Sequence, residues 1–335
     1  KSGIMADILV IGAAIIDVLV SPASEKVFCT GSYPADDIRM AFGADALNEA
    51  SVLAGLGDNV RLETVIGQDK AGEYILKYCQ DKGIEVAGGC VRRDIKTGIN
   101  VVLVRENGER SFLTNRNGSL RSLELSDIRM PFPGDIRILC FASIFVFPHI
   151  GPKELEILFY QAKSQGITVC ADMTKCKNGE TAEELAPAFQ YIDYLFANAE
   201  EAMLLTGEKT VEDACKRMRQ SGAGCVIIKC GAEGCYLENE KESFRLPAAA
   251  GVRCIDTTGA GDSFTAGFIH SLLKGKNLEE CAKYANWCGA QAVETIGATE
   301  WIEAGVKFIL PRPRFSYPCP LFSNLMYYII LQSAL

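Results

Sequence analysis

Two acidic residues flank a glycine-rich turn late in the chain, and a helical pattern follows it at once. The run Asp-Thr-Thr-Gly-Ala-Gly-Asp spans residues 256–262, and Phe264, Phe268 and Leu272 then recur at helical spacing. Free backbone N–H groups and the helix dipole favour an anion at such a start. Glycine also lets a phosphate approach the backbone closely. The sequence therefore predicts an anion site at the beginning of this helix.

The second acid of the run, Asp262, stands beside that anion site. A carboxylate next to a bound phosphate is repulsive unless it has a task, such as taking a proton from an attacking hydroxyl. The combination points to phosphoryl transfer to an alcohol. We expect Asp262 to be the general base and Gly259, Ala260 and Gly261 to hold the phosphate. The simpler interpretation of a glycine turn with an aspartate is a helix cap.

Composition limits the class of protein. The 335 residues are 48% hydrophobic and 23% charged, which suits one large α/β domain. The net charge of −8 argues against nucleic acid or an anionic membrane as a partner. The longest apolar run, residues 138–147, is too short to cross a bilayer. The 14 cysteines include no C-x-x-C and sit largely in apolar runs, which predicts buried thiols in a reducing cytoplasm.

Both ends of the chain differ from its body. Residues 1–4 precede Met5 and resemble a cloning remnant. Residues 310–335 begin with several prolines and end in an isolated apolar stretch. We expect this tail either to be non-native or to dock on the body or a partner. A single domain over residues 5–305 is the expected organisation.

Apolar runs alternate with helical patterns through the body of the chain. Continuous apolar runs are typical of strands buried on both faces, and their alternation with helices predicts a mostly parallel sheet covered on both sides. The fold class expected is thus a three-layer α/β/α domain. The strands are expected at 7–12, 61–66, 136–141, 167–171, 191–196 and 225–229, and two of the helices at 153–164 and 211–221.

Two segments interrupt this alternation. Residues 15–42 contain spaced valines followed by Pro and Gly turns, and residues 98–114 read as a β-hairpin with an Asn-Gly turn. We expect these two segments to form a small sheet separate from the central one.

Three further motifs have both a structural and a functional interpretation. Asn198 with Glu201 forms a capping-box pattern at a helix start. Asp45 is placed to cap the helix that begins near residue 44, and a strand ending at Lys229 runs into a glycine turn. Asp17 follows an apolar run, and its carboxylate is suited to accept two hydroxyl groups.

The run at 256–264, with Asn-x-x-Glu at 198–201 before it, resembles the signatures of the ribokinase-like (PfkB) carbohydrate and nucleoside kinases. The resemblance covers about residues 7–298. It implies a central α/β/α domain with a β-sheet lid over the sugar site, and a lid that often serves as a dimer interface. ATP as phosphoryl donor and Mg²⁺ are implied as well.

The resemblance also implies roles for single residues. Asp17, Gly43 and Asn48 correspond to substrate-binding positions, although the second glycine of that motif is replaced here by Ala44. Asn198 and Glu201 would act on Mg²⁺ through water, since this ion keeps much of its hydration shell. Asp256 corresponds to a ligand of a monovalent cation such as K⁺. The nucleotide is implied to lie along Lys229, Gly231, Gly234 and Asn286.

An ATP-dependent sugar kinase is the leading hypothesis. A nucleoside kinase of the same fold is the alternative, and a catalytically inactive sugar sensor is an alternative of another class. The chain has no P-loop motif and no Gly-x-Gly-x-x-Gly after its first strand. Because the sugar motifs contain no cluster of basic residues, we expect a neutral polyol phosphorylated on a primary hydroxyl, although Arg110, Arg116 or Lys175 could reach in.

Overall fold

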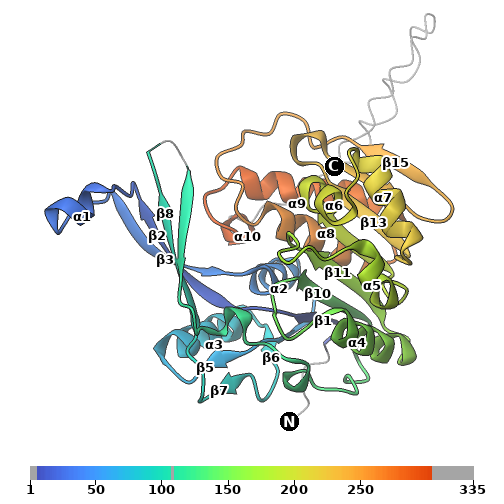
Figure 1. The fold of residues 1–335 in the computed structure, drawn as a ribbon, viewed down its shortest axis with the longest axis horizontal. Coiled ribbons are helices and arrows are strands. Elements are labelled where there is room, and N and C mark those ends of the chain that lie inside the picture. Colours follow the sequence, from blue (N-terminus) through green and yellow to red (C-terminus); the bar gives the residue numbers. More distant parts are fainter. Residues whose placement is uncertain (1–5, 107–108, 304–335) are drawn as a thin grey trace, which may run out of the picture.

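The computed structural model describes residues 6–106 and 109–303, so the predictions for residues 1–4 and 310–335 lie outside the described part of the chain. Over these residues, nine strands form a central sheet in the order β15-β14-β13-β12-β11-β10-β1-β4-β6 (Figure 1). The pairs from β6 to β13 are parallel, and β14 and β15 are added antiparallel. The strands are β1 (Ile8–Ile11), β4 (Val60–Glu63), β6 (Glu85–Val86), β10 (Ile138–Ile144), β11 (Thr168–Met173), β12 (Tyr194–Asn198), β13 (Cys225–Lys229), β14 (Cys235–Glu238) and β15 (Ser243–Leu246).

Helices cover both faces of this sheet and enclose two apolar cores. The core on one face is closed by α4 (Pro152–Ser164), α5 (Ala182–Phe189), α6 (Ala199–Thr206) and α7 (Val211–Gln220). The core on the other face is closed by α2 (Asp45–Gly55), α3 (Lys70–Asp81), α8 (Ala260–Leu273), α9 (Leu278–Val293) and α10 (Glu300–Glu303). The expected three-layer α/β/α class is therefore confirmed.

The expected strands are present with small shifts in their bounds. The run at 61–66 is divided, because β4 ends at Glu63 and the chain then leaves the central sheet. Residues Ile66–Gly67 form β5, which pairs with β7 (Val91–Arg92) in a separate two-stranded sheet. Continuous burial alone could not reveal this departure, because Val65 and Ile66 are also buried.

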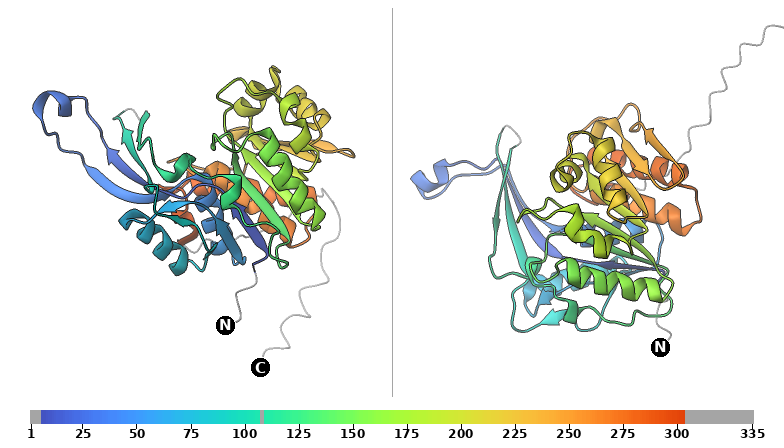
Figure 2. Two further views of the ribbon diagram at one scale, coloured as in Figure 1. Left: turned by 60° about the horizontal axis from the view of Figure 1, so that its bottom comes forward. Right: turned by 45° about the vertical axis from the view of Figure 1, so that its right-hand side comes forward.

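The two interrupting segments form a second sheet, as expected. Four strands pair in the order β3-β2-β8-β9, and in Figures 1 and 2 they extend as an arm from the body. The turn residues Asn107 and Gly108 lie outside the described part. The strands are β2 (Ile15–Ser21), β3 (Asp37–Gly43), β8 (Gly98–Val104) and β9 (Arg110–Thr114), and the short helix α1 (Lys26–Thr30) lies between β2 and β3.

The two faces of this arm differ in character. Asp17 pairs with Asn100, and Val102 pairs with Phe112, so these side chains share the face that turns toward the body. Met40, Val18, Val101 and Leu113 occupy paired positions on the opposite face. Strand alternation therefore gives the arm an inward face that carries its polar side chains among apolar ones, and an apolar outward face.

No helix within residues 6–106 and 109–303 is long and apolar enough to span a membrane.

Candidate active site

The glycine turn at 256–259 leads directly into α8, as the sequence predicts. Gly259 has φ of 69°, a left-handed conformation that favours glycine, and a Cβ added there would lie 2.6 Å from the carbonyl oxygen of Ala298. A Cβ added to Gly261 would instead meet only the side chain of Lys229, whose Nζ would be 3.4 Å away. The first turn of α8 therefore opens into free space beside an ammonium group.

Asp262 lies in this first turn and is held by a residue of α2. Its Oδ2 accepts a hydrogen bond of 2.7 Å from Nδ2 of Asn48. Burial, reinforced by the nearby carboxylate of Asp45, raises the pKa of Asp262 to about 8. The carboxyl group is thus placed by a neutral amide and is basic enough to take a proton near neutral pH.

A cavity of about 610 Å³ adjoins Asp262 and lies beneath the inward face of the arm. Asp17, Asp45, Asn48 and Asn100 line it. Among the described residues, one carboxylate oxygen of Asp17 and the amide oxygen of Asn100 are buried without a hydrogen-bond partner. Because unsatisfied buried oxygens are costly, these atoms are suited to accept hydroxyl groups of a bound molecule. This cavity brings together the three substrate residues expected from sequence, since Gly43 lies against Asp17.

The approach of Asp17 explains the glycine at 43. A Cβ added to Gly43 would lie 2.2 Å from Oδ2 of Asp17. Ala44, where the resembled motif has its second glycine, holds φ of 75° and precedes the first helical residue, Asp45. Asp45 is therefore not the N-cap that the sequence suggested. Its carboxylate instead accepts a hydrogen bond from Ser143, and burial raises its pKa.

A second cavity, of about 480 Å³, lies on the other side of the first turn of α8. It is mainly apolar and is lined by Phe264 and Val293, with Asn286 at its edge. Nδ2 of Asn286 donates to the carbonyl oxygen of Pro247 at 3.1 Å. The four residues expected along a nucleotide all line this cavity: Lys229, Gly231, Gly234 and Asn286.

An acidic cluster joins the two cavities through a third space of about 320 Å³. Lys229 forms an ion pair of 2.5 Å with Asp172, which also accepts a hydrogen bond from Thr265. Burial opposes the charge of Lys229, but Asp172 holds its pKa above the ordinary value. The sequence analysis gave Asp172 no role, although its place near the end of an expected parallel strand is where ligand sites form in such sheets.

Asn198 and Glu201 form the expected capping box at the start of α6. Oδ1 of Asn198 accepts from the Glu201 amide at 2.9 Å, and Oε2 of Glu201 accepts from the Asn198 amide at 2.8 Å. Both residues line the acidic space, and burial raises the pKa of Glu201 to about 7. The capping box expected at the start of α6 is therefore confirmed. The side chain of Glu201 also lines the acidic space.

The donor chemistry of this space fits Mg²⁺ held through water. Its oxygen donors are hard carboxylates and an amide, which suit this ion. Among the described residues, no group of three or more His, Cys, Asp or Glu side chains is close enough to hold a metal directly. Asn198 and Glu201 are the residues of this space that could act on hydrated Mg²⁺.

Asp256, the expected ligand of a monovalent cation, accepts several hydrogen bonds from the chain itself. Its Oδ1 accepts from Nη2 of Arg110 at 2.5 Å and from the amide and hydroxyl of Thr258, while its Oδ2 accepts from the amide of Gly297 at 3.0 Å. Burial opposes ionisation, but these hydrogen bonds lower the pKa of Asp256 to about 2. The positive charge beside this carboxylate comes from Arg110 of β9 in the arm, and a role for K⁺ here stays a prediction from the resemblance.

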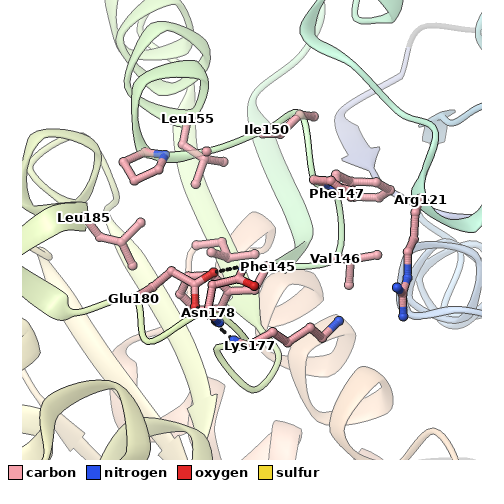
Figure 3. A pocket seen from close by; sticks show the side chains of 14 residues that line it. Arg121, Phe145, Val146, Phe147, Ile150, Leu155, Lys177, Asn178, Glu180 and Leu185 are labelled. Atoms are coloured by element: carbon pink, nitrogen blue, oxygen red, sulfur yellow. Dashed lines mark hydrogen bonds between the residues drawn. The ribbon is translucent and has the colours of Figure 1, made fainter.

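Two basic residues from outside the sugar motifs also line the cavity beneath the arm, and neither is among the three that the sequence left open. Arg121 and Lys177 border both this cavity and an adjoining one of about 240 Å³. Figure 3 shows their side chains extending from opposite sides toward one another. Neither residue belongs to a recognised motif, and Lys177 lies in a loop two residues beyond Lys175, so the sequence alone did not point to them.

Comparison with known proteins agrees with this arrangement. The model of the pfkB family carbohydrate kinases matches residues 5–304. An uncharacterised sugar kinase of Archaeoglobus fulgidus is 37% identical over 259 residues, which are 76% of this chain and 99% of that protein. The crystal structure of a ribokinase from Thermotoga maritima is 26% identical with a TM-score of 0.72, covering 89% of this chain and 98% of that one.

A putative ribokinase II of E. coli, solved in complex with ATP and Mg²⁺, has a TM-score of 0.73 at 21% identity and covers 89% of this chain and 98% of that one. At this identity the likeness concerns the fold. The match to the family model over nearly the whole chain defines the class: the protein belongs to the pfkB family of carbohydrate kinases and is a kinase of that family.

Proposed function

We propose that this protein transfers the γ-phosphoryl group of ATP to a hydroxyl, primary in the expected substrate, of a sugar or sugar-like polyol. The observation that carries the proposal is the position of Asp262. It lies at the first turn of α8, lines the cavity beneath the arm and also the acidic space that leads toward Lys229. A hydroxyl bound in the first cavity and a phosphate at the helix start would both adjoin this carboxylate.

Asp262 would accept the proton of the attacking hydroxyl as its oxygen bonds to the γ-phosphorus, and ADP would leave with the bridging oxygen. Asn48 orients the carboxylate without supplying charge. Gly259, Ala260 and Gly261 would offer backbone N–H groups to the transferred phosphate. Lys229 would neutralise phosphate charge beside Gly261, and Mg²⁺ at the space lined by Asn198 and Glu201 would supply further neutralisation.

The polar lining of the acceptor cavity favours a polyol over a nucleoside. Asp17, Asp45, Asn48 and Asn100 offer oxygen and amide groups that match hydroxyls. A base would need an apolar or aromatic slot, and Phe112, Leu120 and Val146 also line this cavity, so a nucleoside kinase stays the alternative. An inactive sensor would have no use for a basic carboxylate at a helix start, so the position of Asp262 favours an enzyme.

The arm is proposed to act as a lid and as a dimer interface. Its inward face carries Asp17 and Asn100, so closure would exclude water that otherwise hydrolyses ATP. Its outward face leaves large apolar side chains exposed, with Ile38 at 66%, Met40 at 57% and Leu113 at 61%. A second copy of the chain would bury this face. The unpaired thiols of the described cysteines support a reducing, cytoplasmic location.

Replacing the proposed base tests the reaction directly. Asp262→Asn is expected to keep ATP binding while lowering kcat by about 10² to 10⁴-fold, the usual loss for a positioned base. ADP release in a coupled assay with Mg-ATP and a sugar panel measures kcat, and calorimetry with a non-hydrolysable ATP analogue measures binding. Turnover of the variant close to that of the native chain would rule out Asp262 as the base.

The raised pKa of Asp262 predicts the pH dependence of the reaction. The base works only when ionised, and burial places its pKa at about 8. At low concentrations of both substrates, kcat/KM is therefore expected to be level above about pH 8 and to fall about tenfold for each unit below it. A profile that stays flat from pH 8 down to pH 5 contradicts this assignment.

Gly261 tests where the phosphate binds. Its added Cβ would meet only Lys229 at 3.4 Å, so Gly261→Val is expected to fold but to fill the phosphate position. The measurements are urea unfolding and binding of the ATP analogue, with an expected loss of binding at unchanged stability. Gly134→Val is the matched control, because a Cβ there meets nothing within 4 Å. Full ATP binding by Gly261→Val would place the phosphate elsewhere.

The outward face of the arm predicts the assembly state. Met40→Glu puts a charge at the centre of the apolar face and is expected to convert a dimer to a monomer, because burying an unpaired charge is costly. Light scattering coupled to gel filtration reports the mass. Leu204→Glu, at an exposed position of α6 outside the arm, is the control. A native chain that is monomeric at high micromolar concentration excludes the interface.

A further inference from the structure

Arg121 and Lys177 occupy one end of the acceptor region. Arg121 is the last residue of the short helical turn Ser119–Arg121, and Lys177 belongs to the loop after β11. Both line the cavity of about 610 Å³ that contains Asp262 and the adjoining cavity of about 240 Å³, and Val146 also borders both. Because the two spaces share these lining residues, they are neighbouring parts of one region, and the basic pair borders both. Figure 3 draws the lining of the smaller cavity.

The charges of this pair are only partly balanced by the protein, because Glu180 and Asp45 act on Lys177 through space without forming an ion pair with it. Within residues 6–106 and 109–303, neither side chain forms an ion pair with an acidic group. Glu180, the nearest loop carboxylate, is engaged by the amides of Lys177 and Asn178 and by the Asn178 side chain. Burial and the charge of Arg121 lower the pKa of Lys177. Two cations that face one another over a cavity gain stability when an anion binds between them.

That anion is not the nucleotide. The cavity proposed for ATP is lined by Lys229, Gly231 and Asn286, and the acidic space by Asp172 and Glu201, and neither contains Arg121 or Lys177. The basic pair lies only in the acceptor region. The carboxylates of that region, Asp17, Asp45 and Asp262, would repel an anionic group placed beside them, so such a group would bind at the basic pair while hydroxyls face the acids.

We propose that the acceptor is an acidic sugar, whose carboxylate or phosphate group is bound by Arg121 and Lys177 while a hydroxyl elsewhere on its chain faces Asp262. The proposal rests on the kinase reaction proposed above and replaces the neutral polyol expected from sequence. It also makes Arg121 and Lys177 determinants of specificity that bind the non-reacting part of the substrate.

Matched pairs of acceptors test this specificity. Gluconate against glucitol differs by a carboxylate, and fructose 6-phosphate against fructose differs by a phosphate. In the coupled ADP-release assay, kcat/KM is expected to be at least about tenfold higher for the acidic member of one pair, given the usual strength of charge-assisted hydrogen bonds. Preference within the first pair identifies a carboxylate, and preference within the second a phosphate.

Variants then assign the preference to the two residues. Arg121→Gln and Lys177→Gln are each expected to raise KM for the acidic acceptor about 10 to 100-fold, with little change in kcat, in KM for ATP or in the use of the neutral acceptor. Lys175→Gln is the control, because Lys175 pairs with Glu200 at 2.5 Å and does not line either cavity. Calorimetric titration of the same acceptors checks binding without turnover.

Two results separate the failure of this proposal from that of the reaction. Equal or better use of the neutral member of both pairs, unaffected by Arg121→Gln and Lys177→Gln, overturns the acidic acceptor and leaves the kinase reaction standing. Absence of both turnover and binding for every acceptor overturns the reaction and the acidic acceptor together.

Discussion

The site depends on the ion pair between Lys229 and Asp172, because it places one buried positive charge among several carboxylates. Asp45, Asp262 and Glu201 face the same acidic space, and burial raises the pKa of each. A fully ionised cluster of this kind would be strongly unfavourable without Lys229. The arrangement therefore favours protons or incoming cations, and it lets a carboxylate act as a base near neutral pH.

The fold brings these groups together because the strands that carry them end at the same edge of the central sheet. Asp172 and Lys229 lie at the carboxyl ends of β11 and β13, and Asn198 lies at the end of β12, where parallel sheets form their ligand sites. The starts of α2 and α8 meet at the same edge, so Asn48 and Asp262 contact each other across 214 residues of sequence. No single segment contains the site, although each segment places its residue by ordinary local rules.

Local patterns predicted most of the fold and the parts of the site that lie within motifs. The strand and helix runs, the capping box of Asn198 and the glycine turn at α8 depend on neighbouring residues, so the sequence reveals them. Asp45 was misjudged because a cap and a buried ion-cluster residue share the same sequence pattern. Arg121 and Lys177 could not be foreseen, because the fold brings them together from a short helical turn and a loop that carry no motif. The hydrogen bond from Arg110 to Asp256 likewise depends on how the arm folds back.

The arm joins two hairpin-like segments, since β2 and β8 run parallel at its centre although they are distant in the sequence. Each segment contributes one edge strand and one inner strand of the four-stranded sheet. Without the other segment, each inner strand would keep its own edge partner but lose its pairing on the second side, so the four-stranded sheet needs both segments. Recombination between relatives would therefore transfer an acceptor preference only if both segments were exchanged together. Point substitutions at inward positions offer a simpler route, because alternation along each strand leaves the outward face unchanged.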